Sequence, residues 1–236
     1  MENQFSRTEL LIGKEGINKL QTSRVAVFGV GGVGGYVVEA LVRSGVGTID
    51  IIDNDKVHIT NLNRQIIAAH STIGKFKVDV MEERIKDINP DCRVNKYKTF
   101  FTPETSSEFD FSNYDYVVDA IDTVSGKIEL VMKCNETKTP IISSMGAGNK
   151  MHPEMFEISD IYKTSVCPLA KVMRQELKKR GIKKLKVVYS KEIPIKPDSE
   201  EKNTSGKRVP GSNSFVPSAV GLIIAGEVVR TLLKNS

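Results

Sequence analysis

The chain has 236 residues, of which 39% are hydrophobic, and a formal net charge of +5. This length suits one large domain with a buried core. Its three cysteines are odd in number and far apart, which excludes a disulfide framework and a paired-cysteine zinc site. The N-terminus lacks the apolar stretch of a signal peptide, and no apolar run is long enough to cross a bilayer. We therefore expect a cytoplasmic protein without stable membrane insertion.

The first elements in chain order are a helix over residues 8–20 and a buried strand over residues 25–28. The strand runs directly into a glycine turn at residues 29–35. Apolar residues at helical spacing over residues 33–42 predict a second helix, which Gly45 closes.

Strands and helices alternate beyond this point. A strand at residues 49–52 ends at Asp53, and a helix at residues 78–88 is stopped by Pro90. Further strands are expected at residues 94–97, 116–121 and 140–143. This alternation predicts an α/β fold with a doubly wound, mostly parallel, Rossmann-like sheet.

The pattern weakens after Gly146. We expect a loose stretch, then a basic helix at about residues 167–180 and a strand at residues 185–189. A loop rich in Pro, Ser, Gly and charge at residues 194–214 precedes a packed terminal helix at residues 219–233. These elements form a C-terminal α+β extension of the sheet.

The glycine turn suits a phosphate. Gly29, Gly31 and Gly34 satisfy G-x-G-x-x-G between a strand and a helix, and Gly32 lies inside the turn. Free backbone amides and the positive end of the helix dipole attract anions there. Asp53 ends the next strand, where an acid can accept hydrogen bonds from ribose hydroxyls.

Further charged and polar groups follow that a nicotinamide cofactor would not need. Arg64 and Lys77 suit the outer phosphates of a triphosphate and the charge that builds on its α-phosphate. Asn61 and Gln65 are neutral donors, and Asp122, at the end of a strand, is a candidate ligand for Mg²⁺. The set favours ATP with Mg²⁺, and we take Arg64, Lys77 and Asp122 as the candidate catalytic residues.

These motifs resemble the ubiquitin-activating-enzyme-like superfamily, whose bacterial members adenylate sulfur-carrier proteins. The resemblance covers about residues 8–144 and rests on GVGGVGG, DND-x-V-x-x-x-NLNRQ, the G-K-x-K around Lys77 and the D-A-I-D ending at Asp122. It implies that residues 1–150 are an ATP-binding adenylation core and that residues 151–236 are an extension of the same domain for substrate binding and dimerisation. The nucleotide-binding residues would be Arg7, Gly29, Gly31, Gly32, Gly34, Asp53, Asp55, Asn61, Arg64, Gln65 and Lys77. Among these, Arg7 would reach the neighbouring subunit's nucleotide in a homodimer.

Within the superfamily, residues 145–153 and 160–169 are similar to the branch that dehydrates threonylcarbamoyladenosine in tRNA. The sulfur-carrier activators usually carry two C-x-x-C pairs, and this chain has none. Residues 165–191 hold nine basic residues and one acid, a charge that suits tRNA phosphates. The candidate RNA-binding residues are Lys171, Arg174, Lys178, Lys179 and Arg180.

The branch implies ATP-dependent adenylation of the threonyl carboxylate, followed by ring closure with release of AMP, and it leaves room for an accessory protein. Three alternatives stay open. An activator of a ubiquitin-like sulfur carrier would use Cys167, and a non-catalytic RNA-binding module would keep the nucleotide only for regulation. The third alternative is an NAD-dependent oxidoreductase, against which the phosphate-binding charges speak.

Overall fold

A single seven-stranded sheet forms the centre of the molecule in a computed structural model that describes residues 2–196 and 209–234. The strand order is β3-β2-β1-β4-β5-β7-β6, and only β6 is antiparallel to its neighbour. The strands are β1 (Arg24–Phe28), β2 (Thr48–Ile52), β3 (Arg93–Tyr97), β4 (Tyr116–Asp119), β5 (Ile141–Ser144), β6 (Phe156–Asp160) and β7 (Lys186–Ser190). The predicted doubly wound, mostly parallel sheet with a C-terminal α+β extension is confirmed.

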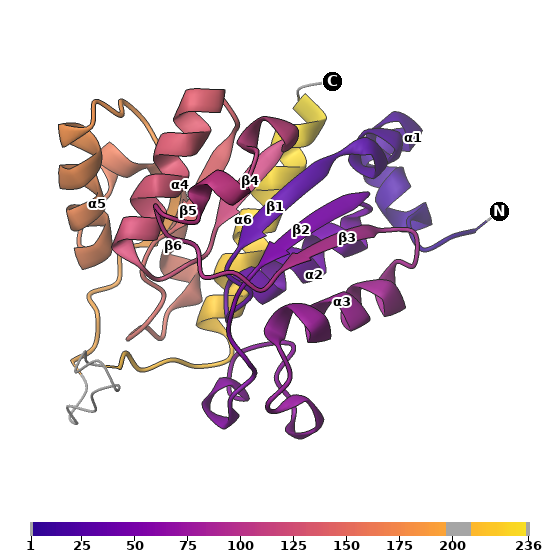
Figure 1. Ribbon diagram of the computed structural model, residues 1–236, viewed down its shortest axis with the longest axis horizontal. Coiled ribbons are helices and arrows are strands. Elements are labelled where there is room, and N and C mark those ends of the chain that lie inside the picture. Colours follow the sequence, from indigo (N-terminus) through magenta and orange to yellow (C-terminus); the bar gives the residue numbers. More distant parts are fainter. Residues whose placement is uncertain (1, 197–208, 235–236) are drawn as a thin grey trace.

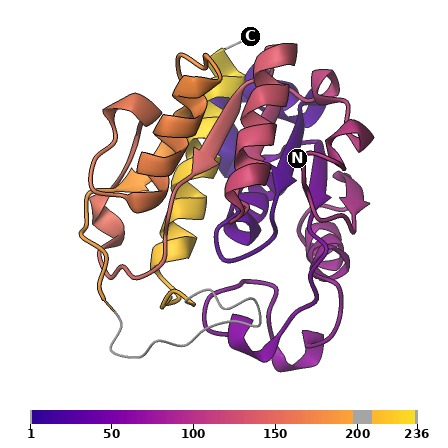
Figure 2. The ribbon, with the colours of Figure 1, turned by 60° about the vertical axis from the view of Figure 1, so that its left-hand side comes forward.

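Helices cover both faces of the sheet (Figure 1). One face carries α1, α2, α3 and α6, and the other carries α4 and α5, as the turned view also shows (Figure 2). The helices are α1 (Ser6–Thr22), α2 (Gly34–Ser44), α3 (Lys77–Ile88), α4 (Val124–Thr137), α5 (Pro168–Lys179) and α6 (Val216–Lys234). Burial on both faces explains why the central strands read as continuous apolar runs, such as the fully buried Val25–Phe28.

The terminal helix α6 is longer than predicted, with 19 residues. It is the one helix in the described ranges that is long and apolar enough to span a membrane, with a mean hydropathy of 1.6. Its buried residues recur at intervals of four from Val216 through Val220 and Ile224 to Val228, and they pack into the core against the sheet. This burial is that of a core helix.

Two elements were not predicted. The edge strand β6 falls in the stretch expected to be loose, because its alternation covers only five residues. The helix α4 follows the D-A-I-D motif, and its early Ser125 and Gly126 weaken the helical signal. The strand β6 extends the sheet beyond β7, and the helix α4 covers one face of the sheet at β4 and β5.

The predicted loop at residues 194–214 has its middle, residues 197–208, outside the described residues. Both of its described flanks are bound to Asn149. The Ile195 amide donates to the Asn149 backbone oxygen at 2.8 Å, and the Gly211 amide donates to the Asn149 side-chain oxygen at 2.6 Å. Asn149 has a positive φ of 58°, a conformation that asparagine tolerates better than most residues.

Candidate nucleotide-binding site

The candidate site lies where the order of the sheet reverses, between β1 and β4. In doubly wound sheets the helices after two such strands go to opposite faces, and a crevice opens at the carboxyl ends of the strands. Here α2 follows β1 and α4 follows β4 on opposite faces. We call this end of the sheet the carboxyl edge.

Packing alone requires two of the four glycines singled out in the turn. Gly29 has a φ of +92°, and a Cβ atom there would lie 2.7 Å from the Ala120 carbonyl oxygen. A Cβ atom on Gly34 would lie 1.8 Å from the carbonyl oxygen of Gly29. Both positions therefore exclude any side chain, whether or not a ligand is bound.

The other two glycines face side chains and not backbone. A Cβ atom on Gly31 would approach only the Gln65 amide nitrogen, at 3.8 Å, whereas one on Gly32 would lie 3.2 Å from the Pro217 Cβ atom and 3.4 Å from the Arg64 side chain. In the part of the chain that the structure describes, no hydrogen bond is made by the amides of residues 31–34. Unpaired amides at a helix N-terminus fit the phosphate that the sequence predicts.

Asp53 lies directly after β2 and is fixed beside the glycine turn. Its Oδ2 accepts a hydrogen bond from the Val30 amide at 2.8 Å, and its Oδ1 accepts one from the Asp55 amide at 2.8 Å. Burial raises the pKa of Asp53, and the positive charge of Lys77 opposes that rise. The carboxylate holds the turn in place at the end of β2, the position for which the sequence predicts a ribose contact.

Lys77 is the first residue of α3 and is only 5% exposed. Its Nζ lies 2.7 Å from Asp55 Oδ2 and 3.8 Å from Asp53 Oδ1. The structure thus brings these three predicted residues together. Two carboxylates already restrict the conformation of the Lys77 side chain. Contact with a phosphate oxygen would therefore cost little further conformational entropy.

The NLNRQ segment supplies two polar side chains next to the turn. Gln65 is buried, and its side-chain oxygen has no hydrogen-bond partner within the described ranges. Arg64 is half-buried, donates to the Thr60 carbonyl oxygen at 2.8 Å, and has no carboxylate partner among the described residues. Burial lowers the pKa of Arg64. An arginine without a counter-ion fits a polyphosphate ligand. The unpaired Gln65 oxygen is an acceptor, so it needs a donor such as a water or a ligand hydroxyl or amino group.

Asn61 is used inside its own loop. Its side-chain oxygen accepts a hydrogen bond from the His58 amide at 2.9 Å and so caps the short 3₁₀ turn Ile59–Asn61. Asn63, not singled out from the sequence, donates to the Ser212 carbonyl oxygen at 3.0 Å. The NLNRQ segment is therefore bound to the segment that leads into α6.

The two aspartates of D-A-I-D differ sharply. Asp122 is exposed, lies between β4 and α4, and makes no hydrogen bond or ion pair with a described residue. Asp119 is fully buried and pairs with Lys127 Nζ at 3.0 Å, while the same ammonium donates to the Ser144 carbonyl oxygen at 2.7 Å. Asp119 is thus a structural residue that ties β4 to β5 through α4.

The described residues contain no cluster of three or more His, Cys, Asp or Glu side chains that could hold a metal ion by themselves. Mg²⁺ commonly binds one or two carboxylates together with substrate phosphates and waters. Asp122, exposed and unpaired at the carboxyl edge, fits the role of that single carboxylate.

Two lysines of this region were missed from the sequence. Lys127 lies one turn into α4, and nothing in its local pattern separates it from a surface lysine. Lys150 follows β5 and is only 3% exposed, although its ammonium makes no ion pair with a described residue. A lysine after a strand end in a Gly-rich segment was the available signal for Lys150.

Arg7 is not brought to this site. It is exposed in the first turn of α1, close to Phe5, which packs on Gly45 at the end of α2. That end of α2 is opposite the glycine turn. Within one chain, Arg7 therefore lies away from the phosphate-binding edge.

The candidate RNA-binding residues lie on or just after α5 and fall into two groups. Arg174 donates to the Thr164 carbonyl and hydroxyl oxygens, and Lys179 and Arg180 both pair with Glu176. Lys171 and Lys178 are exposed without an ion pair in the described ranges. These two lysines are the most available to a phosphate backbone.

A doubly wound sheet with open amides at its switch point, a buried lysine and an unpaired arginine defines a nucleotide-binding protein of the adenylating type. Comparison with known proteins agrees. The chain belongs to the ThiF family, whose model matches residues 5–236.

Close relatives cover the whole chain. It is 51% identical to the tRNA threonylcarbamoyladenosine dehydratase of Bacillus subtilis, with 100% of this chain and 96% of that protein covered. Among solved structures, the tRNA N6-threonylcarbamoyladenosine dehydratase of Escherichia coli in complex with AMP superimposes with a TM-score of 0.90 at 32% identity, covering 98% of this chain and 94% of that one. The ATP complex of the same E. coli enzyme gives a TM-score of 0.89.

Relatives that resemble the sulfur-carrier activators match less of the chain. A probable molybdopterin-synthase adenylyltransferase of Gracilaria tenuistipitata is 35% identical over 52% of this chain and 34% of its own length. Cys167, the thiol that such an activity would use here, is only 2% exposed at the start of α5. Both observations favour the dehydratase branch.

Proposed function

We propose that this protein is an ATP-dependent dehydratase that cyclises threonylcarbamoyladenosine in tRNA. The observation that carries the proposal is the carboxyl edge of the sheet, where the glycine turn has open amides, Arg64 and Gln65 lie beside it, and Lys77 is held near Asp53 at the end of the neighbouring strand. Support comes from the 51% identical B. subtilis relative and from the E. coli enzyme with bound ATP.

The nucleotide would bind with its ribose at Asp53 and its phosphates against the amides of residues 31–34. Gln65 would donate its amide to a phosphate oxygen beside Gly31. Arg64 would pair with the outer phosphates. Asp122 would hold Mg²⁺, which neutralises phosphate charge when bound.

The first chemical step forms a bond from a threonyl carboxylate oxygen to the α-phosphorus of ATP and breaks the bond to pyrophosphate. Negative charge grows on the α-phosphate oxygens in the transition state. Lys77, preset by Asp55, would follow that charge, and stabilisation of this kind is the main contribution of such a site.

The second step closes a five-membered ring. A neighbouring nitrogen or oxygen of the ureido group attacks the acyl carbon and loses its proton, and AMP departs with the former carboxylate oxygen. The substrate has then lost the elements of one water, while ATP has become AMP and pyrophosphate. The protein needs no nucleophile of its own, because both reacting groups lie in the substrate and positioning supplies the remaining effect.

The exposed lysines of α5, Lys171 and Lys178, would make the main contacts with tRNA phosphates. Arg174, Lys179 and Arg180, which already have partners within the chain, would contribute less. Such contacts position a nucleic acid without reading its sequence. Residues 151–236, which contain α5, would form the substrate-binding and dimer extension of the adenylation core at residues 1–150.

A homodimer would complete the site. Leu10 and Leu11 are each 86% exposed on α1, next to Arg7. Exposed leucines beside a cation suit a protein interface. Arg7 lies far from the nucleotide site of its own chain. In a dimer, it would reach the nucleotide of the partner subunit.

The test is mass spectrometry of nucleosides from threonylcarbamoyl-modified tRNA incubated with the protein, ATP and Mg²⁺. We expect the modified nucleoside to lose one water only when ATP is present, with one AMP formed per nucleoside. An unchanged nucleoside, with AMP formed only after addition of a ubiquitin-like carrier, would contradict the proposal.

A further inference from the structure

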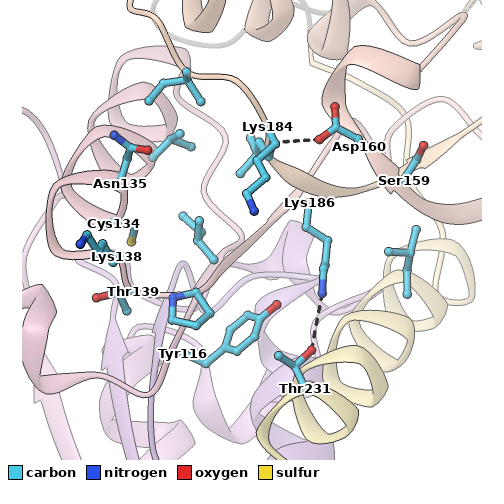
Figure 3. Close-up of a pocket in the computed structure, with 16 residues that line it drawn as sticks. Tyr116, Cys134, Asn135, Lys138, Thr139, Ser159, Asp160, Lys184, Lys186 and Thr231 are labelled. Carbon is cyan, nitrogen blue, oxygen red and sulfur yellow. Dashed lines mark hydrogen bonds between the residues drawn. The ribbon is translucent and has the colours of Figure 1, made fainter. Parts of the chain in front are cut away.

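A second cavity lies at the end of the sheet opposite the nucleotide site. It has a volume of about 670 Å³ and is lined where β4, β5 and β7 begin, by α4 and α6, and by the end of the antiparallel β6 (Figure 3). Because β4 starts at Tyr116 and reaches Asp122 only after its carboxyl end, the cavity is separate from the phosphate turn. We call this end of the sheet the amino edge. The volume is in the range of small-molecule sites.

The cavity has an apolar wall and a polar floor. Val131, Ile141, Ile158 and Leu185 supply aliphatic surface. Figure 3 shows the hydroxyl of Tyr116 and that of Thr231 beside Lys186 at the floor. Such a lining suits a ligand with a flat apolar body and a polar end.

The charged groups of the lining are unbalanced. It contains three lysines, Lys138, Lys184 and Lys186, against one carboxylate, Asp160. The ammonium group of Lys186 pairs with the carboxylate of Glu227, which lies outside the lining, at 2.6 Å. The carboxylate of Asp160 accepts hydrogen bonds from the backbone amides of Tyr162 and Leu185. These pairings leave Lys138 and Lys184 available.

Lys138 and Lys184 make no ion pair with any residue in the ranges 2–196 and 209–234. They come from different elements, since Lys138 caps the end of α4 and Lys184 precedes β7. Both are exposed residues of the cavity lining. Figure 3 shows the two side chains on different sides of the cavity, and neither is held by a carboxylate of a described residue, so each is available to an anion that enters between them.

The backbone of Lys138 gives an independent indication. Lys138 has a φ of +60°, the left-handed conformation in which glycine or asparagine usually ends a helix. A lysine is disfavoured in this conformation relative to glycine, because its Cβ atom crowds the backbone. Strained positions of this kind cluster at ligand-binding sites, and here the strained residue carries one of the two available cations.

We propose that the amino-edge cavity binds a small organic phosphate, a phosphomonoester with one ring. Lys138 and Lys184 contact the phosphate, and the ring lies against Ile141 and Ile158. Two lysines favour a doubly charged phosphate over a carboxylate. The proposal is independent of the dehydratase reaction, because no residue of the carboxyl edge takes part.

The test uses phenyl phosphate as the probe and the full chain with saturating ATP, so that the nucleotide site is filled. Isothermal titration should give saturable binding of one phenyl phosphate per chain, at millimolar affinity or tighter. Phenol and inorganic phosphate, each carrying half of the chemistry, should bind at least tenfold more weakly. Absent binding, or inorganic phosphate binding as tightly as the probe, overturns the proposal.

Paired variants separate the site from general charge attraction. Lys138→Gln with Lys184→Gln should weaken phenyl phosphate binding at least tenfold, without a change in the thermal midpoint. The control, Lys14→Gln with Lys163→Gln, removes the same charge from exposed positions outside the cavity lining and should change nothing. An equal loss in both pairs overturns the proposal. So does the case in which the cavity pair lowers only tRNA affinity, which would make this rim part of the RNA surface.

Discussion

The two ends of the sheet are built in different ways. At the carboxyl edge, the charged residues come mainly from one continuous part of the chain, residues 29–77, and some of them hold one another, as Asp55 holds Lys77. At the amino edge, the cavity takes its lining from dispersed elements, and two of its three lysines, Lys138 and Lys184, have no ion pair with a described residue. Function at the first end is therefore encoded in a local motif, while the second end has no motif. Substitutions at specific residues test whether the two ends differ in this way.

The largest effect is expected inside the carboxyl edge, at Lys127. Lys127→Met leaves Asp119 as a buried carboxylate without its counter-ion, and breaking such a pair costs about 3–5 kcal/mol. Urea unfolding should show this loss. Lys133→Met, on the same helix but half-exposed, should stay within about 0.5 kcal/mol of the wild type. An equal loss in both variants would show that the buried pair has no special role.

Lys77→Met should slow turnover strongly, with little effect on tRNA affinity. Removing one donor that follows transition-state charge costs a factor of about 10²–10³ in rate. The measurement is AMP release under single-turnover conditions, with Lys75→Met as an exposed control in the same segment. Turnover at the wild-type rate in Lys77→Met would reject adenylation at this edge.

The glycine turn should separate stability from binding. Gly34→Ala forces a Cβ atom against the Gly29 carbonyl oxygen and should cost about 3 kcal/mol of unfolding free energy. Gly31→Ala meets open space, so it should fold normally and weaken ATP binding instead. Thermal unfolding with and without ATP checks both. Equal stability of the two variants would contradict the assignment of their roles.

The helix α5 should contribute to tRNA affinity through its unpaired lysines. Lys171→Gln with Lys178→Gln should lower affinity uniformly across tRNAs and reduce the salt dependence by about one ion per lysine. Lys14→Gln serves as a surface control. A salt slope that stays at the wild-type value would remove α5 from the RNA-binding surface.

The smallest expected effect concerns the pH dependence of stability at Asp53. Burial raises the pKa of Asp53, so the folded state holds this proton more firmly than the unfolded state. The resulting stability is complete below the unfolded pKa of about 4 and is lost as pH rises through the folded value. Asp53→Asn cannot ionise. The unfolding free energy of this variant, measured relative to that of the wild type, should therefore increase between pH 4 and pH 7. A gap that shrinks over this range would contradict the expected sign.

Much of the fold could be predicted because its strands are continuous apolar runs with a helix or turn signal at each end. The runs at Val25–Phe28 and Ile49–Ile52 are examples. The edge strand β6 was missed because four of its five residues are only partly buried and its pattern is short. The helix α4 was missed because its stability comes from tertiary contacts such as Lys127 with Asp119, not from local propensity.

The candidate site was predictable to the extent that it is contiguous. The grouping of Asp53, Asp55 and Lys77 follows from strand ends and a helix start that lie close in sequence. By contrast, the use of Asn61 to cap its own turn depends on loop geometry, which residue types do not specify. Buried lysines were missed for the same reason, since burial depends on which elements later cover a residue.

Asn149 holds together two points that lie 16 residues apart in the sequence, because it binds both Ile195 and Gly211. Its left-handed backbone is tolerated by asparagine but costly for most other residues. One residue type after β5 therefore sets where the backbone approaches α6.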